Sequence, residues 1–351
     1  LGLIALSAPF EGRVDREELR RHLHWHHGDP DAIPFHYRQQ FRPWARDWGF
    51  CVPQRLYDAL EPGSYDVRIR TREAPGRLRA LEAVHPGERS ETIVLAAHLD
   101  RPGVANDGLS GAAVAVEAFR RLPGRRTRFT YRLALVAGTI GSEYYLAFLP
   151  PEERARLFEG VFLEMLGSTT PLVLQRSREG RATLDSALAR ALGGRGAPHR
   201  VADFETVLVN DEYVWEGHGV PMASLSRFPY PEYHSSRDNA AAMSEAALEE
   251  AAAVLLAAID DLEATPLVTR GFDGILCLSN PEYDLYVDPG EPVLGRPGNE
   301  ESLRWRRLMD LIPALRRPAT TRDLAERTGL PEPQVRAYLA RWREKGLIAM
   351  D

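Results

Sequence analysis

Short apolar segments alternate with segments of helical periodicity through the middle of this chain, and this alternation constrains the fold more than any other feature. Residues 91–98, ETIVLAAH, form an almost continuous apolar run, which is typical of a strand buried on both faces of a sheet. Residues 106–122 then repeat apolar side chains at helical spacing. The pattern predicts an α/β fold with helices on both faces of a central sheet. Further strands are predicted at 131–138, 161–166, 206–210 and 220–226, and further helices at 141–148, 184–192 and 244–264.

The segments on either side of this core differ from it in composition. We expect the α/β core to span residues 91–265. Residues 1–52 are rich in Arg and His and predict a helical N-terminal segment, whereas residues 53–90 alternate apolar and polar side chains and predict a small β-rich segment. Residues 266–300 are rich in Pro, Gly and Asn, which indicates a linker. Residues 301–351 contain three short helical patterns and a β-like end, the outline of a winged helix-turn-helix.

Composition excludes several classes of protein. The chain has 351 residues, 44% of them hydrophobic and 27% charged, as in an ordinary soluble globular protein. Its formal net charge of −6 argues against a surface that binds nucleic acid or membranes as a whole. Cys51 and Cys277 lie far apart, so neither a disulfide framework nor a thiolate metal site is indicated. The apolar start, LGLIALSAPF, is too short to span a bilayer, and a cytoplasmic protein is expected.

The segment HLDRPGVANDGLSG carries the first candidate metal ligands. His98 ends a predicted buried strand, and Asp100 follows two residues later, where a carboxylate can orient the imidazole of a metal ligand. Asp107 begins the next helical segment and could present a bridging carboxylate. An alternative interpretation is a hydrogen-bonded histidine at a strand end and a helix N-cap at Asp107.

Two further candidates lie later in the chain. Glu164 occurs within an apolar strand, where a carboxylate is costly to bury unless it is paired or bound to metal. It could instead point outward from an edge strand. His234 lies in a polar loop with aromatic neighbours, and such loops carry function more often than packing, although a surface histidine is the simpler interpretation. All four candidates fall at or just past predicted carboxyl ends of strands, where ligands gather in α/β sheets.

Five motifs follow one another in a characteristic order: HLD, NDGLSG, LEMLGS, NDEYVWEGHGVP and YHSSRDN. In this order the chain resembles the co-catalytic zinc aminopeptidases, which are relatives of glutaminyl cyclase. It is more similar still to a bacterial branch with an aminopeptidase-like domain, an aromatic RPxxRDWGF motif, here at Arg42–Phe50, and a C-terminal winged helix, here after about residue 302. The resemblance implies a mixed central sheet, a zinc cofactor and an N-terminal segment that completes the catalytic domain.

The resemblance also implies roles for individual residues. His98 would be a zinc ligand oriented by Asp100, and Asp107 would be the bridging carboxylate. Glu164 stands where the family usually has Asp, and His234 matches the last ligand. The family's two adjacent glutamates are absent from LVAGTIGSEYY at 135–145, so a single zinc ion with three or four of these ligands is also compatible with the sequence. Without those glutamates, either Glu143 or Glu212 could act as the general base.

Other residues near these motifs suggest substrate contacts. Arginines could bind a carboxylate in bidentate fashion, and tyrosines could line a side-chain pocket. A cluster of N-terminal histidines suggests a second metal site, although no acidic residue or cysteine completes the set. The substrate candidates are Arg176, Arg178, Arg227, Arg237, Tyr230 and Tyr233, and the clustered histidines are His22, His24, His26 and His27.

We interpret the sequence as that of a zinc-dependent hydrolase of a peptide or amide bond, most concretely an aminopeptidase-type exopeptidase acting on a small or modified peptide. In this interpretation zinc polarises the carbonyl and activates a water molecule. Two alternatives stay open: a DNA-binding regulator with a degenerate peptidase domain, and an inactive scaffold. A structural or dimer-forming winged helix is favoured over DNA binding, because acidic residues accompany the basic side chains of the last helix. These basic residues are Arg336, Arg341, Arg343 and Lys345.

Overall fold

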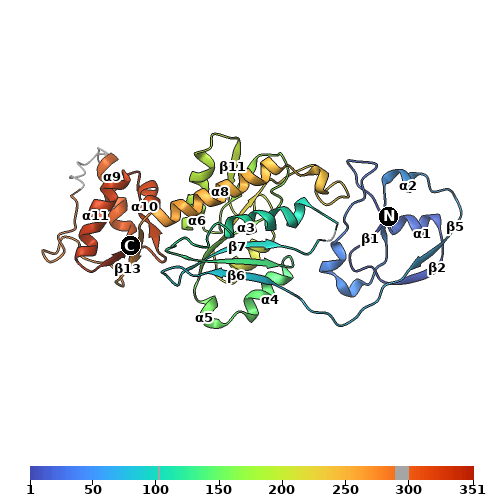
Figure 1. Cartoon of the computed structure of the whole chain (residues 1–351), viewed down its shortest axis with the longest axis horizontal. Helices are drawn as coiled ribbons and strands as arrows, with labels where there is room; N and C mark the ends of the chain where they lie inside the picture. The colour runs from blue at the N-terminus through green and yellow to red at the C-terminus, as the bar shows by residue number, and fades with distance from the viewer. Residues whose placement is uncertain (102, 289–299) are drawn as a thin grey trace, which may run out of the picture.

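A computed structural model describes residues 1–101, 103–288 and 300–351 of the chain. Three parts follow one another along its long axis (Figure 1): an N-terminal unit, a central α/β core and a C-terminal helical unit. Within the described residues, no helix combines the length and the apolar character that crossing a membrane requires.

A seven-stranded mixed sheet forms the centre of the molecule, which confirms the predicted fold class. The strand order is β11-β10-β12-β9-β7-β8-β6. Neighbouring strands from β12 to β8 run parallel, whereas β6 is antiparallel to β8, and β10 is antiparallel to β12. The strands are β6 (Leu81–His85), β7 (Thr92–His98), β8 (Thr130–Val136), β9 (Leu157–Leu163), β10 (Leu172–Gln175), β11 (His199–Ala202) and β12 (Met222–Ser226).

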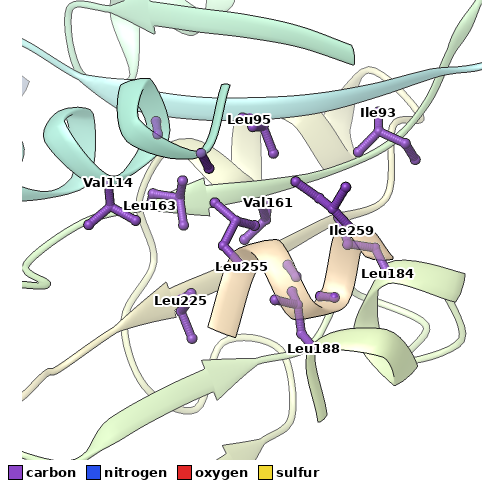
Figure 2. Packing of buried hydrophobic residues seen from close by; sticks show 14 of the residues in the cluster. Ile93, Leu95, Val114, Val161, Leu163, Leu184, Leu188, Leu225, Leu255 and Ile259 are labelled. Carbon is purple, nitrogen blue, oxygen red and sulfur yellow. The ribbon is translucent and has the colours of Figure 1, made fainter. Parts of the chain in front are cut away.

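Both faces of the sheet are covered by helices. Ile93 and Leu95 of β7 face one apolar cluster and Val94 faces the other, because successive side chains of a strand point in opposite directions. Leu255 and Ile259 of α8 pack over the first face beside α6 (Figure 2). Helices α3, α6 and α8 cover this face, and α4 and α7 cover the other. The helices of the core are α3 (Gly111–Phe119), α4 (Ile140–Phe148), α5 (Pro151–Arg154), α6 (Thr183–Gly193), α7 (Asp211–Gly217) and α8 (Glu245–Ala264).

The sequence-based prediction of a strand at 206–210 is wrong. This segment is irregular, and its backbone is satisfied by a side chain instead of a neighbouring strand. Gln175 accepts hydrogen bonds from the backbone N–H groups of Val207 and Leu208, and its amide donates to the carbonyl of Leu208. The strands that complete the sheet here are β10 and β11.

The N-terminal unit is less helical than the sequence suggests. Its longest helix ends at Arg21, because the next residues turn into a short strand, and the unit consists mainly of short strands and turns. The predicted β-rich segment 53–90 is not one unit either, since β5 pairs with the N-terminal β2 whereas β6 joins the central sheet. The elements are β1 (Gly2–Leu3), β2 (Phe10–Asp15), α1 (Arg16–Arg21), β3 (Leu23–His24), η1 (Arg38–Phe41), η2 (Pro43–Ala45), β4 (Phe50–Cys51), α2 (Gln54–Asp58) and β5 (Ser64–Ile69).

The C-terminal unit has its own apolar core, which includes Leu308 and Trp342. It begins inside the expected linker, because strand β13 pairs with two strands from the end of the chain. Residues 289–299 of the expected linker lie outside the described residues, and the winged helix stays a prediction. The elements are β13 (Leu267–Arg270), α9 (Glu300–Leu311), β14 (Ala319–Thr320), α10 (Thr321–Thr328), α11 (Glu332–Glu344) and β15 (Ile348–Met350).

Candidate metal centre

Three potential ligands meet at the carboxyl edge of the parallel strands. His98 is the last residue of β7, Glu164 directly follows β9, and Asp107 lies in the turn η3 (Asn106–Ser110) that precedes α3. One ligand atom of each lies within 4.8 Å of those of the other two. In the described part of the chain, no other group of three or more His, Cys, Asp or Glu side chains meets this condition.

The chemistry of this group fits a metal ion. All three side chains are buried, with exposed fractions of 0% for His98, 1% for Asp107 and 0% for Glu164. His98 Nε2, Asp107 Oδ1 and Glu164 Oε1 are buried atoms without a hydrogen-bond partner. Unpaired buried polar atoms are costly, and a divalent cation would satisfy all three at once. Imidazole nitrogen and carboxylate oxygen are ligands that zinc accepts.

The simpler interpretations of these residues do not hold. Asp107 is not an N-cap, because the N-cap residues of η3 and α3 are Ala105 and Ser110. Glu164 does not point outward from an edge strand. It follows β9, which lies between β12 and β7, and its Oε2 accepts a hydrogen bond from Asn210 Nδ2 at 2.7 Å.

Asp107 lies between two histidines. Its Oδ1 is 3.3 Å from His98 Nε2, and its Oδ2 is 3.1 Å from His234 Nε2. His234 has a positive φ of 53°, and so does Met165 beside Glu164, with φ 51°. Such conformations are strained for residues other than glycine and often occur at functional sites. The loop after β12 therefore presents His234 to Asp107 in a conformation that the surrounding structure must hold.

Negative charge surrounds His98. Asp100 Oδ1 lies 3.2 Å from His98 Nδ1, the position predicted for an orienting carboxylate. Burial alone would lower the pKa of His98, but contacts with Asp100 and Asp107 and the nearby charges of Asp211 and Glu164 raise it to about 10. The raised pKa reflects the concentration of acidic side chains around this imidazole.

Glu212, one of the two candidate bases, is buried beside this group. Its Oε1 accepts hydrogen bonds from Gln175 Nε2 at 3.1 Å and from the Asn210 backbone at 3.0 Å, while its Oε2 has no partner. Burial raises the pKa of Glu212 to about 7. Burial and the neighbouring Glu212 also raise the pKa of Glu164. The second candidate, Glu143, has an exposed side chain on α4 and contacts His218 at 3.0 Å.

Asp238, a residue that was not predicted from the sequence, fixes the turn η3 that carries Asp107. Its carboxylate accepts hydrogen bonds from the backbone N–H groups of Ala105, Asn106 and Asp107. Tyr230, a substrate candidate, is buried and donates its hydroxyl to the same carboxylate. The signal for Asp238 was its place in the YHSSRDN motif. Asp211, also missed, is buried near His98 and accepts from Ser142 Oγ.

The structure does not bring three of the candidate arginines to the metal centre. Arg227 is buried, and its guanidinium is used by Glu250 and by backbone carbonyls that include Leu166 O. Arg176 and Arg178 follow β10, and because β10 is antiparallel to β12, it ends toward the opposite edge of the sheet. Arg178 stacks on Phe204 there and lies 3.2 Å from Glu205.

The N-terminal unit docks on the loop that carries His234. Phe35 donates its backbone N–H to His234 O at 2.8 Å, and the fourth candidate arginine, Arg237, pairs with Asp29 at 2.7 Å. Phe35 and Tyr37 contact the His234 ring edge-on, with centroid distances of 5.5 and 4.9 Å. This unit therefore forms one wall of the region beside the metal centre.

A cavity of about 570 Å³ lies between the N-terminal unit and the loop of His234. Tyr233, the remaining substrate candidate, lines it and stacks on His234. A second cavity of about 400 Å³ borders Asp107 on the side of Asp100 and Arg101. The first cavity is lined by Leu23, His24, Trp25, His26, His27, Gly28, Pro34, Phe35, His36, Tyr37, Arg38, Tyr233 and His234.

The N-terminal histidines belong to this wall instead of forming a second metal site. His22 stacks on Trp48 with a centroid distance of 3.7 Å, and His26 Nδ1 accepts from the backbone of Gly28 and Asp29. Both His22 and His26 are thus occupied by other contacts.

Most of the basic residues on α11 also have intramolecular partners. Arg341 donates to the carbonyl of Asp284, Lys345 donates to that of Glu282 at 2.9 Å, and Arg336 lies 3.4 Å from Glu332. The segment before 289 thus covers part of the helix that a DNA-binding regulator would use.

The fold is similar to those of solved structures described as peptidases. A solved structure from Clostridium acetobutylicum, described as a "putative peptidase", superposes on the whole of this chain and 78% of its own, with a TM-score of 0.70 and 23% identity. A zinc aminopeptidase from Bacillus subtilis covers 68% of this chain and 63% of its own, with a TM-score of 0.52 and 15% identity. At these identities the likeness concerns the fold.

Residues 32–265 match a family described as a domain of unknown function, DUF4910, and the chain belongs to this family. A relative from Clostridium acetobutylicum is 27% identical over 270 residues, 75% of this chain. It is named "Putative polysaccharide biosynthesis protein with aminopeptidase-like domain". The chain matches 60% of that protein's length, less than two thirds of it.

Proposed function

We propose that this protein is a zinc-dependent hydrolase of the aminopeptidase type, which cleaves a peptide or amide bond in a small substrate. The observation that carries the proposal is the group of His98, Asp107 and Glu164, whose ligand atoms are buried, close together and without hydrogen-bond partners. Three protein ligands are typical of catalytic zinc sites, which keep one coordination position open. When bound, zinc supplies a Lewis acid that polarises a carbonyl.

The cavities beside the metal centre support a small substrate. The cavity of about 570 Å³ next to His234 has aromatic walls from Trp25, Phe35 and Tyr37. Small-molecule sites commonly have volumes of about 300–1,000 Å³ and combine apolar walls with a few polar groups. Imidazoles from the N-terminal unit provide such polar groups here, so this unit would select the substrate while the core holds the reacting bond.

Glu212 is the residue that we assign to proton transfer. Its Oε2 is buried and unpartnered, and its elevated pKa, about 7, allows a carboxyl group to both accept and release a proton near neutral pH. Asn210 contacts both carboxylates, donating its side-chain amide to Glu164 and its backbone N–H to Glu212. This contact keeps Glu212 next to the proposed metal ligand.

The proposal is tested by metal analysis and activity on the same preparation. We expect the purified chain to contain zinc, and to hydrolyse members of a library of aminoacyl amides and dipeptides. Chelation should abolish this hydrolysis, and added zinc should restore it. The variant His98→Ala should lose both metal and activity. Glu212→Gln should keep the metal and lose about 10²–10⁴-fold in kcat, the usual contribution of a general acid or base.

His199 provides a matched control, because it is an exposed histidine on β11 that hydrogen-bonds only its own loop, at Ala197 O. His199→Ala should retain metal and activity. A chain that purifies without metal, gains none from zinc solutions and responds to neither chelation nor His98→Ala would be an inactive scaffold, and the proposal would be wrong.

For the C-terminal unit we propose a winged helix with a structural or dimer-forming role. Three helices and the three-stranded sheet β14-β13-β15 support this assignment. The partners of Arg341 and Lys345 within the chain argue against a DNA-binding surface on α11.

A further inference from the structure

Arg101 lies next to the proposed metal ligands, and the proposed function gives it no role. Its Nη1 contacts both Asp107 Oδ2 and His234 Nε2. The side chain is mostly buried, with 19% of it exposed, and it borders the cavity on the Asp100 side. One guanidinium nitrogen therefore bridges a carboxylate and an imidazole, an arrangement in which a metal ion could equally lie.

The two oxygens of Asp107 thus face two different cation positions. Oδ1 points to His98 and belongs to the group with Glu164, which contains no arginine or lysine. Oδ2 points to His234, and there the guanidinium already supplies a positive charge. Because Arg101 donates to His234 Nε2, this nitrogen is not free to bind a metal while the contact exists.

Electrostatics favours Arg101 as a stable occupant of the position between Asp107 Oδ2 and His234. An arginine stays protonated at any physiological pH, and its planar guanidinium forms strong charge-assisted hydrogen bonds to carboxylates. A second divalent ion at Oδ2 would have to displace this charge and lie close to it. With only Asp107 and His234 as ligands, it would also have one protein ligand fewer than catalytic zinc sites usually provide.

We propose that the guanidinium of Arg101 permanently occupies the cation position beside Asp107 Oδ2. The centre therefore binds a single metal ion, through His98, Asp107 and Glu164. In this arrangement His234 is a positioning residue that holds Arg101 against Asp107, and it is not a metal ligand. This inference rests on the proposed metal site and refines it.

The test is the number of ions bound, measured by titration with Zn²⁺ and Co²⁺ and by elemental analysis of the full chain. The wild type should bind one ion per chain. Arg101→Lys keeps the positive charge and should also bind one. Arg101→Glu replaces the cation with a third ligand beside Asp107 and His234, and should bind two.

His234→Ala separates the two possible roles of the imidazole. If His234 is a positioning residue, its loss should weaken metal binding by about 10–100-fold, which is the usual effect of removing a group outside the ligand set. Loss of His98 should instead abolish saturable binding. Arg121→Gln, an exposed arginine of the segment after α3 that pairs with Glu117, is the matched control and should bind one ion like the wild type.

Each outcome bears on the inference separately from the proposed function. Two ions in the wild type, or abolished binding in His234→Ala, would overturn the inference while leaving a metal-dependent hydrolase intact. One ion in a folded Arg101→Glu variant would also overturn it. No ion in the wild type would contradict the proposed function itself.

Discussion

At the scale of single residues, the candidate metal centre buries four acidic side chains, and Glu164 and Glu212 each keep a carboxylate oxygen without a hydrogen-bond partner. Asp107, Glu164, Asp211 and Glu212 are all at most 1% exposed. Burial raises the pKa of Glu164 and of Asp211, which is the response of carboxylates that lack sufficient positive charge nearby. Buried charge is tolerated only when it is paired or bound to metal. The proposed ion would supply that pairing for Asp107 and Glu164.

Asp238 should control metal affinity without being a ligand. Its carboxylate fixes the backbone of residues 105–107, so Asp238→Asn should loosen Asp107 and weaken metal binding by about 10–100-fold. Isothermal titration with zinc measures this change. Asp203→Asn, an exposed aspartate in the loop after β11, should leave the affinity unchanged. An unaltered affinity in Asp238→Asn would mean that the turn keeps its shape without this carboxylate.

Residue types and their order were enough to find most of the site. His98, Asp107, Glu164 and His234 were predicted from motifs, and the structure brings them together. Arg101 could not be found, because an arginine in a polar loop resembles any solvated surface charge. Glu143 was chosen for its nearness in sequence, but its exposed side chain on α4 contacts His218.

At the scale of secondary-structure elements, a close contact between α3 and β9 aligns the two ligand-bearing segments. A Cβ atom at Gly111 would lie 1.9 Å from Leu163 O and 2.8 Å from the Cα of Glu164. Leu166 N donates to Ser110 Oγ at 2.8 Å, and Gly167 N donates to Asn106 Oδ1 at 2.7 Å. The start of α3 is thus bound to the chain beside Glu164, and no side chain fits between them.

Gly111→Ala should therefore separate Asp107 from Glu164. Overpacking against backbone atoms that cannot yield typically costs about 1–3 kcal/mol, so we expect a lower denaturation midpoint together with loss of metal. Gly193→Ala at the end of α6 is the control, since a Cβ there meets nothing within 4 Å. That variant should be neutral or slightly more stable, because alanine favours helix over glycine. Full metal binding by Gly111→Ala would show that the close contact is dispensable.

The existence of the buried strands and long helices could be predicted, whereas the direction of β10 could not. A short apolar run predicts a strand but does not predict whether that strand is parallel or antiparallel to its neighbours. The antiparallel course of β10 directs Arg176 and Arg178 away from the candidate metal centre, and their role as substrate contacts stays a prediction.

At the scale of the whole molecule, the core and the C-terminal unit are joined by a charged network around Asp261 of α8. Asp261 contacts Arg190 of α6 and Arg322 of α10, and Arg190 in turn lies 3.2 Å from Asp323. The two parts have separate apolar clusters, divided within β13 between Leu267 and Val268. Their docking therefore depends substantially on polar contacts.

Asp261→Asn should weaken this docking. Breaking a fully buried ion pair costs about 3–5 kcal/mol, and since Asp261 retains 14% exposure and Arg322 38%, we expect a smaller loss of about 1–2 kcal/mol. Thermal unfolding followed by the fluorescence of Trp305 and Trp342 in the C-terminal unit should shift to lower temperature than unfolding of the core. Asp260→Asn, at the exposed neighbouring position, should unfold like the wild type. Equal shifts for both parts would mean that the network does not control docking.

The sequence by itself determined the class of fold and the candidate metal ligands His98, Asp107 and Glu164, because strand burial and ligand chemistry depend on residue types and their order. Only the tertiary structure decided which side chains share the centre with them. Three features depend on contacts between residues that are distant along the chain or on rotamers set by packing. They are the docking of the N-terminal unit on His234, the direction of β10 and the contact of Arg101 with Asp107. No local pattern specifies such contacts, since many arrangements of the same loops satisfy the same propensities.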